Sequence, residues 1–137
     1  MFVKYIFLVI ILIVSIISPS NSNSISGSIL ASRYSSSIND FQKSAEYTLN
    51  ILKSGYKDAA FYNDALLYLV ASGNFNDAFK LSNEMYDLGL RSPALGLVMI
   101  IEKIKKEELD NSLSLIKLFE KNLPPVLVGS FRGWVNL

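Results

Sequence analysis

The chain contains neither cysteine nor histidine, and these two absences exclude most common kinds of catalytic and metal-binding site. Without them there are no thiolate nucleophiles, no Ser-His-Asp or Cys-His triads, no zinc fingers and no metal site that needs an imidazole. A lipid-modified cysteine after the first apolar segment is excluded too. We therefore expect no metal or other cofactor, and no catalytic residues.

Carboxylates are the acid-base groups that remain in quantity, and their positions suit helix ends better than a reaction. Glu107, Glu108 and Asp110 lie in an expected turn, and Asp58 and Asp64 flank an expected helix start. Negative charge at these places stabilises a helix N-terminus through the helix dipole. We therefore interpret these carboxylates as capping groups and expect a protein that is not an enzyme.

Charge of either sign is scarce, since charged residues make up 18% of the chain and the formal net charge is +1. Lys4 is the only charged residue in the segment 1–24, so the rest of the chain has equal numbers of acidic and basic side chains. Nucleic-acid binding depends on clustered lysine and arginine that neutralise phosphates. This balance argues against a nucleic-acid partner.

The N-terminal segment, residues 1–24, has the three-part order of a secretory signal peptide. A short basic start, Met1 to Lys4, precedes an apolar run from Tyr5 to Ile17, and a Ser/Asn-rich stretch follows Pro19. Spanning a bilayer takes about 20 apolar residues, and this run is shorter. We therefore expect cleavage near Ser24 and a periplasmic or secreted protein. The alternative is a membrane anchor formed by residues 5–17, which would be the chain's one contact with a membrane.

A regular period runs through the remaining chain without gaps. It aligns Phe41 with Phe75 and Leu109, and it aligns Gly55 with Gly89. The period divides the domain, residues 25–137, into repeats 25–58, 59–92 and 93–126, followed by a partial repeat 127–137. Repeats of about 34 residues are typical of stacked helical units.

Each unit has the pattern of two helices joined by a short turn. The second helix of the middle unit carries apolar or small residues at helical three-and-four spacing, and we expect Phe75, Ala78, Phe79, Leu81, Ser82 and Met85 to form one buried stripe. Asn39-Asp40, Asn74 and Ser92 stand where N-caps are expected, and Pro93 follows as a first helical residue. Gly55 and Gly89 stand at expected helix C-termini. The sequence therefore predicts an all-α helix-turn-helix solenoid.

This pattern resembles the tetratricopeptide repeat (TPR) family, in particular exported bacterial members. The resemblance rests on the repeat period, on large apolar residues at Phe41, Phe75 and Leu109, and on small residues at Ser44, Ala78 and Ser112. The chain departs from the family pattern at Leu66 and Ile100, where small residues are usual, and at Thr48 and Ser82, where an aromatic is common. The resemblance implies a non-catalytic scaffold for protein–protein interaction.

The resemblance also implies a peptide groove, because the first helix of each TPR unit lines the concave face of the solenoid. The residues that this register places in the groove, and that we single out, are Arg33, Asn63, Leu67, Leu97, Ile101 and Lys105. Some family members hold a peptide carboxylate with lysine and asparagine, but the equivalent positions here are mainly apolar. We therefore expect the partner to be an apolar or helical peptide.

Three interpretations stay open at this stage. The repeats are either an independent binding module or the helical scaffold of a larger envelope enzyme, and an uncleaved N-terminus would instead make the protein a membrane-anchored assembly factor. The end of the chain is strongly apolar, with Phe131 and Trp134 among its last residues. Since a solenoid needs a polar terminal face, we expect this end to self-associate or to continue into further repeats of a longer protein.

Overall fold

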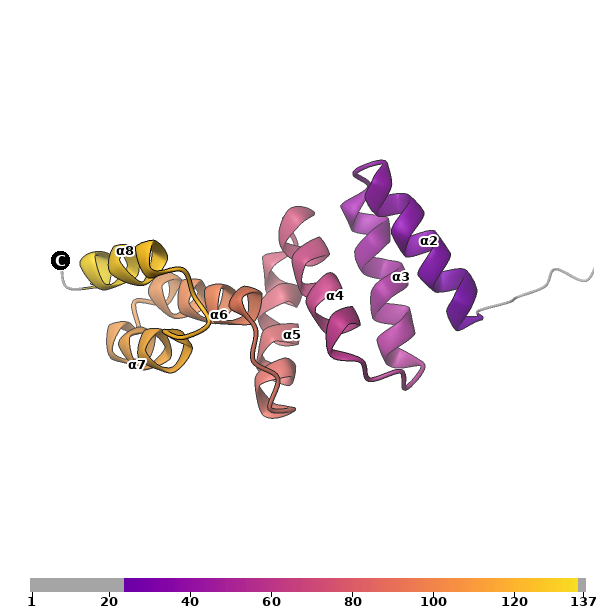
Figure 1. Ribbon diagram of the computed structural model, residues 1–137. Helices are drawn as coiled ribbons and strands as arrows, with labels where there is room; N and C mark the ends of the chain where they lie inside the picture. The colour runs from indigo at the N-terminus through magenta and orange to yellow at the C-terminus, as the bar shows by residue number, and fades with distance from the viewer. Residues whose placement is uncertain (1–23, 136–137) are drawn as a thin grey trace, which may run out of the picture.

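The computed structural model describes residues 24–135, and this part of the chain is entirely helical (Figure 1). The predicted signal peptide or anchor lies almost wholly outside the described residues. The helices of the described chain are α2 (Ile25–Ser37), α3 (Phe41–Lys53), α4 (Ala59–Ala71), α5 (Phe75–Asp87), α6 (Pro93–Lys105), α7 (Leu109–Phe119) and α8 (Pro125–Val135).

The helices begin at the intervals that the repeat period predicts. The first helices of the units begin at Ile25, Ala59 and Pro93, and the second helices begin at Phe41, Phe75 and Leu109. The partial repeat differs, because α8 begins at Pro125 and the period places its start at position 127. The cause lies in the preceding helix: α7 has 11 residues where α3 and α5 have 13. A proline cannot continue a helix but suits its first turn, so Pro125 starts α8 early.

Side-chain caps mark the starts of α2 to α6, whereas the side chain of Glu108, which precedes α7, makes no cap hydrogen bond. Acceptor side chains bond to backbone N–H groups in the first turn at Ser24, Asp40, Asp58, Asn74 and Ser92. The turn inside each unit takes a left-handed residue at the same place, namely Asn39, Gly73 and Glu107, with φ of 60°, 78° and 59°. Glycine adopts this conformation freely and asparagine tolerates it, whereas a glutamate there is strained. The capping predictions for Asp40, Asn74 and Ser92 are confirmed.

The core lies between successive helices and depends on small residues in the second helix of each unit. Ser44, Ala78 and Ser112 are fully buried. Leu66 and Ile100, the large residues at positions where the family prefers small ones, are fully buried as well. The buried stripe predicted for α5 is confirmed at Ala78, Leu81, Ser82 and Met85.

Two phenylalanines of that predicted stripe differ from the expectation. Phe75 is exposed and Phe79 is only partly buried. Phe75 is the first residue of α5, and its counterpart in the first unit, Phe41, is partly buried and stacks on Tyr68. The prediction that Phe75 is buried is therefore wrong. Three-and-four spacing predicts the helix face on which a residue lies, but not whether another helix covers that residue.

The helices stack one after another along an elongated molecule, with the two ends of the described chain far apart (Figure 1). Each helix packs against the next, and α4 also contacts α6. In the view of Figure 1, α2 to α5 run roughly up and down, whereas α6 to α8 run across the page. The stack therefore twists between its first half and its second half.

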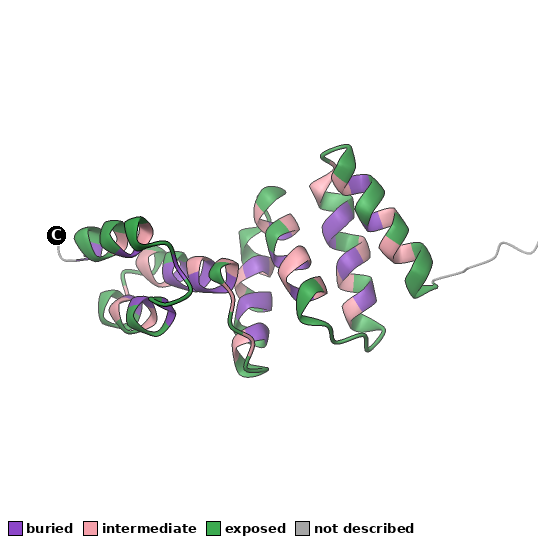
Figure 2. Cartoon of the chain, in the orientation of Figure 1, coloured by how far each residue is buried: buried purple, intermediate pink, exposed green. Residues whose placement is uncertain are grey.

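The first helix, α2, is largely exposed, and the residues that it buries are polar (Figure 2). The buried residues of α2 are Ser32 and Ser35. Ser32 Oγ lies 2.7 Å from Thr48 Oγ1 and donates to the Ser44 carbonyl oxygen at 3.2 Å. Leu30 and Tyr34 face outward and are 70% and 67% exposed. Ser32 thus stands where the later units bury the aliphatic side chains Leu66 and Ile100.

Candidate functional site

The predicted groove residues lie on the first helices of the three units. Arg33 is on α2, Asn63 and Leu67 are on α4, and Leu97, Ile101 and Lys105 are on α6. Contact between α4 and α6 brings the last five residues onto neighbouring helices. Arg33 stands apart from them, because α2 packs mainly against α3.

The central part of this surface is apolar and open to solvent. Leu67 is 53% exposed and Ile101 is 46% exposed, at equivalent places on α4 and α6. Leu97 is partly buried and packs against the core. Exposed side chains of this size on adjacent helices, with a covered apolar base, form a surface of the kind that binds other proteins.

The two cations of the predicted groove are differently placed. Lys105 is exposed, and its Nζ lies 6.0 Å from the centre of the Phe79 ring, a weak cation–π contact. Arg33 is exposed on α2, in the first helix pair. None of the ion pairs within residues 24–135 involves either side chain. Both charges are therefore available to a ligand.

Asn63 has one polar atom that the described residues leave without a partner. Its Nδ2 donates to the Ala59 carbonyl oxygen at 3.0 Å, whereas its buried Oδ1 accepts no hydrogen bond from residues 24–135. Burying an acceptor without a donor costs about 1 to 3 kcal/mol. The exchange of Oδ1 and Nδ2 does not remove this cost, because the bond to Ala59 needs the amide donor. Asn63 Oδ1 is thus a polar atom of the groove that can still accept a hydrogen bond.

A pocket of about 280 Å³ opens between α6 and α8 and extends the groove beyond the predicted residues. Its lining residues are Ile101, Ile104, Ser130, Phe131 and Trp134. Trp134 is 71% exposed at this pocket. Sequence reasoning identified the apolar character of residues 126–137 but did not place them in the groove. The feature that places these residues in the groove is the early start of α8 at Pro125, which shifts the last helix relative to the repeat period.

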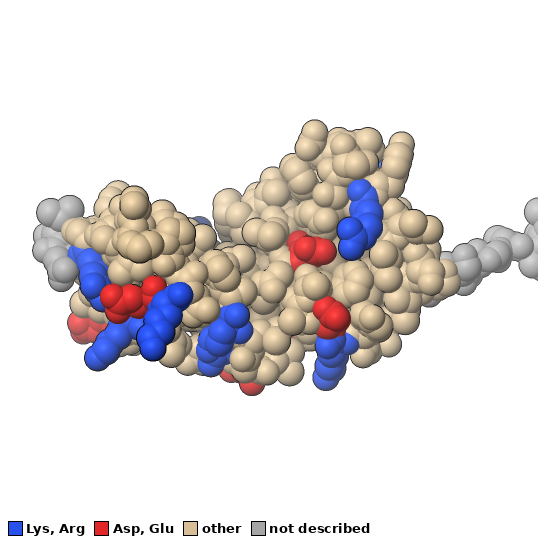
Figure 3. Space-filling view, in the orientation of Figure 1, with Lys and Arg blue, Asp and Glu red and all other residues tan. Residues whose placement is uncertain are grey.

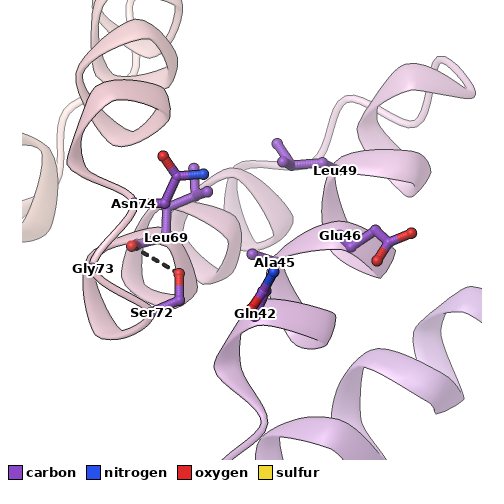
Figure 4. A pocket seen from close by; sticks show the side chains of 8 residues that line it. All are labelled: Gln42, Ala45, Glu46, Leu49, Leu69, Ser72, Gly73 and Asn74. Atoms are coloured by element: carbon purple, nitrogen blue, oxygen red, sulfur yellow. Dashed lines mark hydrogen bonds between the residues drawn. The ribbon is translucent and has the colours of Figure 1, made fainter.

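A second, larger pocket of about 430 Å³ lies between α3 and the end of α4 (Figure 4). Gln42, Ala45, Glu46 and Leu49 line it from α3, and Leu69, Ser72, Gly73 and Asn74 line it from the end of α4 and the following turn. Its polar groups largely serve the local fold, since Ser72 donates to the Leu69 carbonyl oxygen and Asn74 caps α5. None of the predicted groove residues lines this pocket.

The lysines near the end of α6 are engaged by carboxylates. Lys103 donates to Glu108 at 2.9 Å, and Lys106 donates to Glu102 at 2.6 Å. The hydrogen bond from Lys103 lowers the pKa of Glu108 below its ordinary value, with a second contribution from Asn111. Figure 3 shows few charged side chains on the face that it presents, and most lie near its lower edge. Lys103 and Lys106 are therefore paired, whereas Lys105 takes part in no ion pair within residues 24–135.

A tyrosine–carboxylate pair joins the two helices of the middle unit. The Tyr62 hydroxyl donates to Glu84 Oε1 at 2.9 Å, and burial followed by this hydrogen bond raises the pKa of Tyr62. A tyrosine whose pKa is raised is a weaker acid and holds its proton more firmly. The pair therefore fixes α4 against α5 and supports the helix that carries Asn63 and Leu67.

Within residues 24–135 no group of three or more acidic side chains is arranged to hold a metal ion, and no helix is long and apolar enough to cross a membrane. Comparison of the chain with known protein families, with characterised proteins and with solved structures finds no match. The candidate site therefore rests on the geometry described above, with α4, α6 and α8 as its walls.

Proposed function

We propose that the protein is a non-catalytic, TPR-type scaffold that binds a protein or peptide partner along its first helices. The observation that supports this most directly is the exposure of Leu67 and Ile101 at equivalent places on contacting helices. Large apolar side chains exposed together on neighbouring helices are typical of a surface that binds another protein. The recurrence of helix starts at equivalent positions of the three units supports the family proposal.

The proposed place of action is the cell envelope, either the periplasm or the exterior. This part of the proposal depends on the sequence of residues 1–24 and is tested by N-terminal sequencing of protein recovered from an envelope fraction. A start within a few residues of Ile25 supports export and cleavage. Recovery of intact Met1 from washed membranes overturns cleavage and supports an anchor at residues 5–17.

The binding surface is tested by the substitution Leu67→Glu. We expect the variant to lose partner retention in a pull-down from a bacterial envelope extract, because it places a charge in the centre of an apolar surface. Leu88→Glu is the matched control, since Leu88 is 46% exposed at the end of α5 and lies outside the groove. Helix content measured by circular dichroism should be unchanged in both. Retention by Leu67→Glu together with loss in Leu88→Glu moves the site to the second helices.

A further inference from the structure

The first helix exposes a row of large apolar side chains on its outer side. Leu30, Tyr34 and Ile38 are 70%, 67% and 55% exposed. They stand four residues apart in sequence, so they lie along one side of α2 and of the residue that ends it. The residues that α2 buries are Ser32 and Ser35. A helix with water on its outer side usually buries its apolar residues and exposes its polar ones. The outer side of α2 is therefore suited to apolar surroundings.

The row is accessible because α2 stands at one end of the described stack (Figure 1). α2 packs mainly against α3, and the rest of the stack extends away beyond α3. A flat surface can therefore approach Leu30 and Tyr34 without meeting α4 to α8.

The segment before α2 brings this row to a membrane. Residues 5–17 lie outside the described residues, and their sequence is expected to enter a bilayer, either as a signal peptide or as an anchor. Seven residues, 18–24, separate this run from α2. A chain spans at most about 3.3 to 3.6 Å per residue, so the start of α2 stays within about 25 Å of the end of the run. The chain itself therefore holds α2 beside a bilayer for as long as residues 1–24 are attached.

The charges around the row do not oppose contact with lipid headgroups. The row is flanked on α2 by exposed serines and by Arg33, and α2 has no carboxylate. Asp40, in the following turn, caps α3 and lies 3.7 Å from Lys43 Nζ. The other charged residues of α3 are Glu46 and Lys53, so the segment 24–53 has three cations and two carboxylates. Cations near a bilayer surface are attracted to its anionic lipids.

We propose that α2 lies in the surface of the bilayer that residues 5–17 enter, with Leu30, Tyr34 and Ile38 at the boundary between headgroups and acyl chains. Helices that lie in a membrane surface bury their apolar side about 5 to 10 Å deep, which accommodates side chains of this size. The occupant of the row is lipid, because the row is apolar, is open at the end of the stack and follows a segment expected to enter a membrane. The inference adds a second membrane contact to the one expected of residues 5–17, and it goes beyond the proposed scaffold function.

The test places a tryptophan reporter on α2 of the full-length chain, with residues 1–24 attached. Trp134 is the only tryptophan, and it lies on α8 at the opposite end of the stack (Figure 1). Trp134→Phe removes it, and Leu30→Trp in that background reports α2 alone. Leu88→Trp in the same background is the matched control, because Leu88 is 46% exposed at the end of α5. Each protein is mixed with vesicles of phosphatidylcholine and phosphatidylglycerol that have plain or brominated acyl chains, since bromine quenches a tryptophan that reaches the acyl layer.

The position of each reporter decides the outcome. We expect the α2 reporter to shift its emission to shorter wavelength on the vesicles and to lose roughly half of its intensity to brominated lipid, whereas Leu88→Trp and the native Trp134 should each lose roughly a tenth or less. Quenching of the α2 reporter that is no stronger than that of Leu88→Trp overturns the inference. Emission at short wavelength before vesicles are added, without quenching afterwards, also overturns it, because residues 5–17 or a second copy then cover the row. Equal quenching of Trp134 overturns the choice of α2.

A charged substitution checks that the row itself makes the contact. Tyr34→Glu, added to the α2 reporter, should reduce its quenching roughly threefold or more, because a carboxylate in the row opposes insertion. Gln42→Glu adds the same charge at an exposed position of α3 and should leave the quenching nearly unchanged. Quenching that Tyr34→Glu does not reduce overturns the row as the contact. The pull-down with Leu67→Glu tests the scaffold proposal on another helix, so either proposal can fail while the other stands.

Discussion

The packing of α6 on α7 depends on a glycine, Gly96. Gly96 is buried, and a Cβ at this position would lie 2.8 Å from Cγ and Cδ1 of Phe119 and 3.0 Å from its Cβ. Phe119 is itself fully buried. Because the Cβ and Cγ atoms lie close to the backbone, a ring rotation cannot clear the space. We therefore expect Gly96→Ala to force α6 and α7 apart.

Two opposing effects set the size of this change. Alanine is favoured over glycine inside a helix by about 0.8 to 1.0 kcal/mol. Overpacking a well-packed core costs about 1 to 3 kcal/mol. The difference is a net loss of about 1 kcal/mol in the free energy of unfolding for Gly96→Ala. For a domain of about 100 residues, this corresponds to a fall in Tm of roughly 4 to 8 °C.

Thermal and urea unfolding followed by circular dichroism measure this change, and α8 supplies the controls. Gly129 and Gly133 are exposed on α8, and no atom lies within 4 Å of a Cβ built on either. Alanine at those positions should raise the stability, because only the helix preference acts. A rise in Tm for Gly96→Ala equal to the rise for Gly129→Ala would refute the close contact with Phe119.

Three further predictions concern the inside of the first and second units. Ser32→Ala removes the hydroxyl that contacts Thr48 Oγ1 at 2.7 Å, and urea unfolding should show a loss of about 1 kcal/mol; an unchanged midpoint contradicts the bond. Ala78→Phe fills a fully buried position and should cost about 1 to 3 kcal/mol, so an unchanged Tm contradicts the packing of α4 on α5. The folded-state pKa of Tyr62 is raised above 10.0, so its contribution to stability is present below about pH 10 and is lost as the pH rises through the folded-state value. Tyr62→Phe should remove that part of the alkaline loss, and an unaltered alkaline profile in Tyr62→Phe contradicts it.

The positions of the helices were predictable because the residues that mark helix starts act within one turn of the chain. Asp40, Asn74 and Ser92 form caps with donors in the first turn of the helix that each precedes, and the repeat alignment uses residue types alone. For the groove, the sequence predicted which positions of the first helices line it, but not how exposed their side chains are. The exposures of Leu67 and Ile101 depend on how closely neighbouring units pack, and that is not a local property.

The parts that sequence reasoning missed depend on contacts between units. The α6–α8 pocket needs α8 to begin at Pro125, and that start follows from the shorter α7. The burial of Ser32 in α2 was also missed, because serine suits either side of a helix and its hydrogen bonds to Ser44 and Thr48 of α3 decide its direction. The burial of Phe75 likewise depends on contacts between helices, and this side chain is exposed.

The polar buried residues of α2 lead to a last prediction about the order in which the helices of the stack unfold. In a solenoid, stability is nearly a sum of intrinsic and nearest-neighbour terms, so the unit with the weakest core opens first. The buried residues of α2 are two serines, whereas α6 buries Leu95, Val98, Met99 and Ile100 among others.

Each fully buried aliphatic side chain contributes about 1.5 to 3 kcal/mol, and a net hydrogen bond contributes about 0.5 to 1.5 kcal/mol. Hydrogen exchange followed by mass spectrometry should therefore show α2 exchanging first and α6 last. Replacing Ser32 and Thr48 together with valines, which removes both partners of the hydroxyl contact, should slow exchange in α2 and leave α6 unchanged. Exchange in α2 as slow as in α6 before any substitution would mean that its outer apolar face, with Leu30 and Tyr34, is already covered in solution.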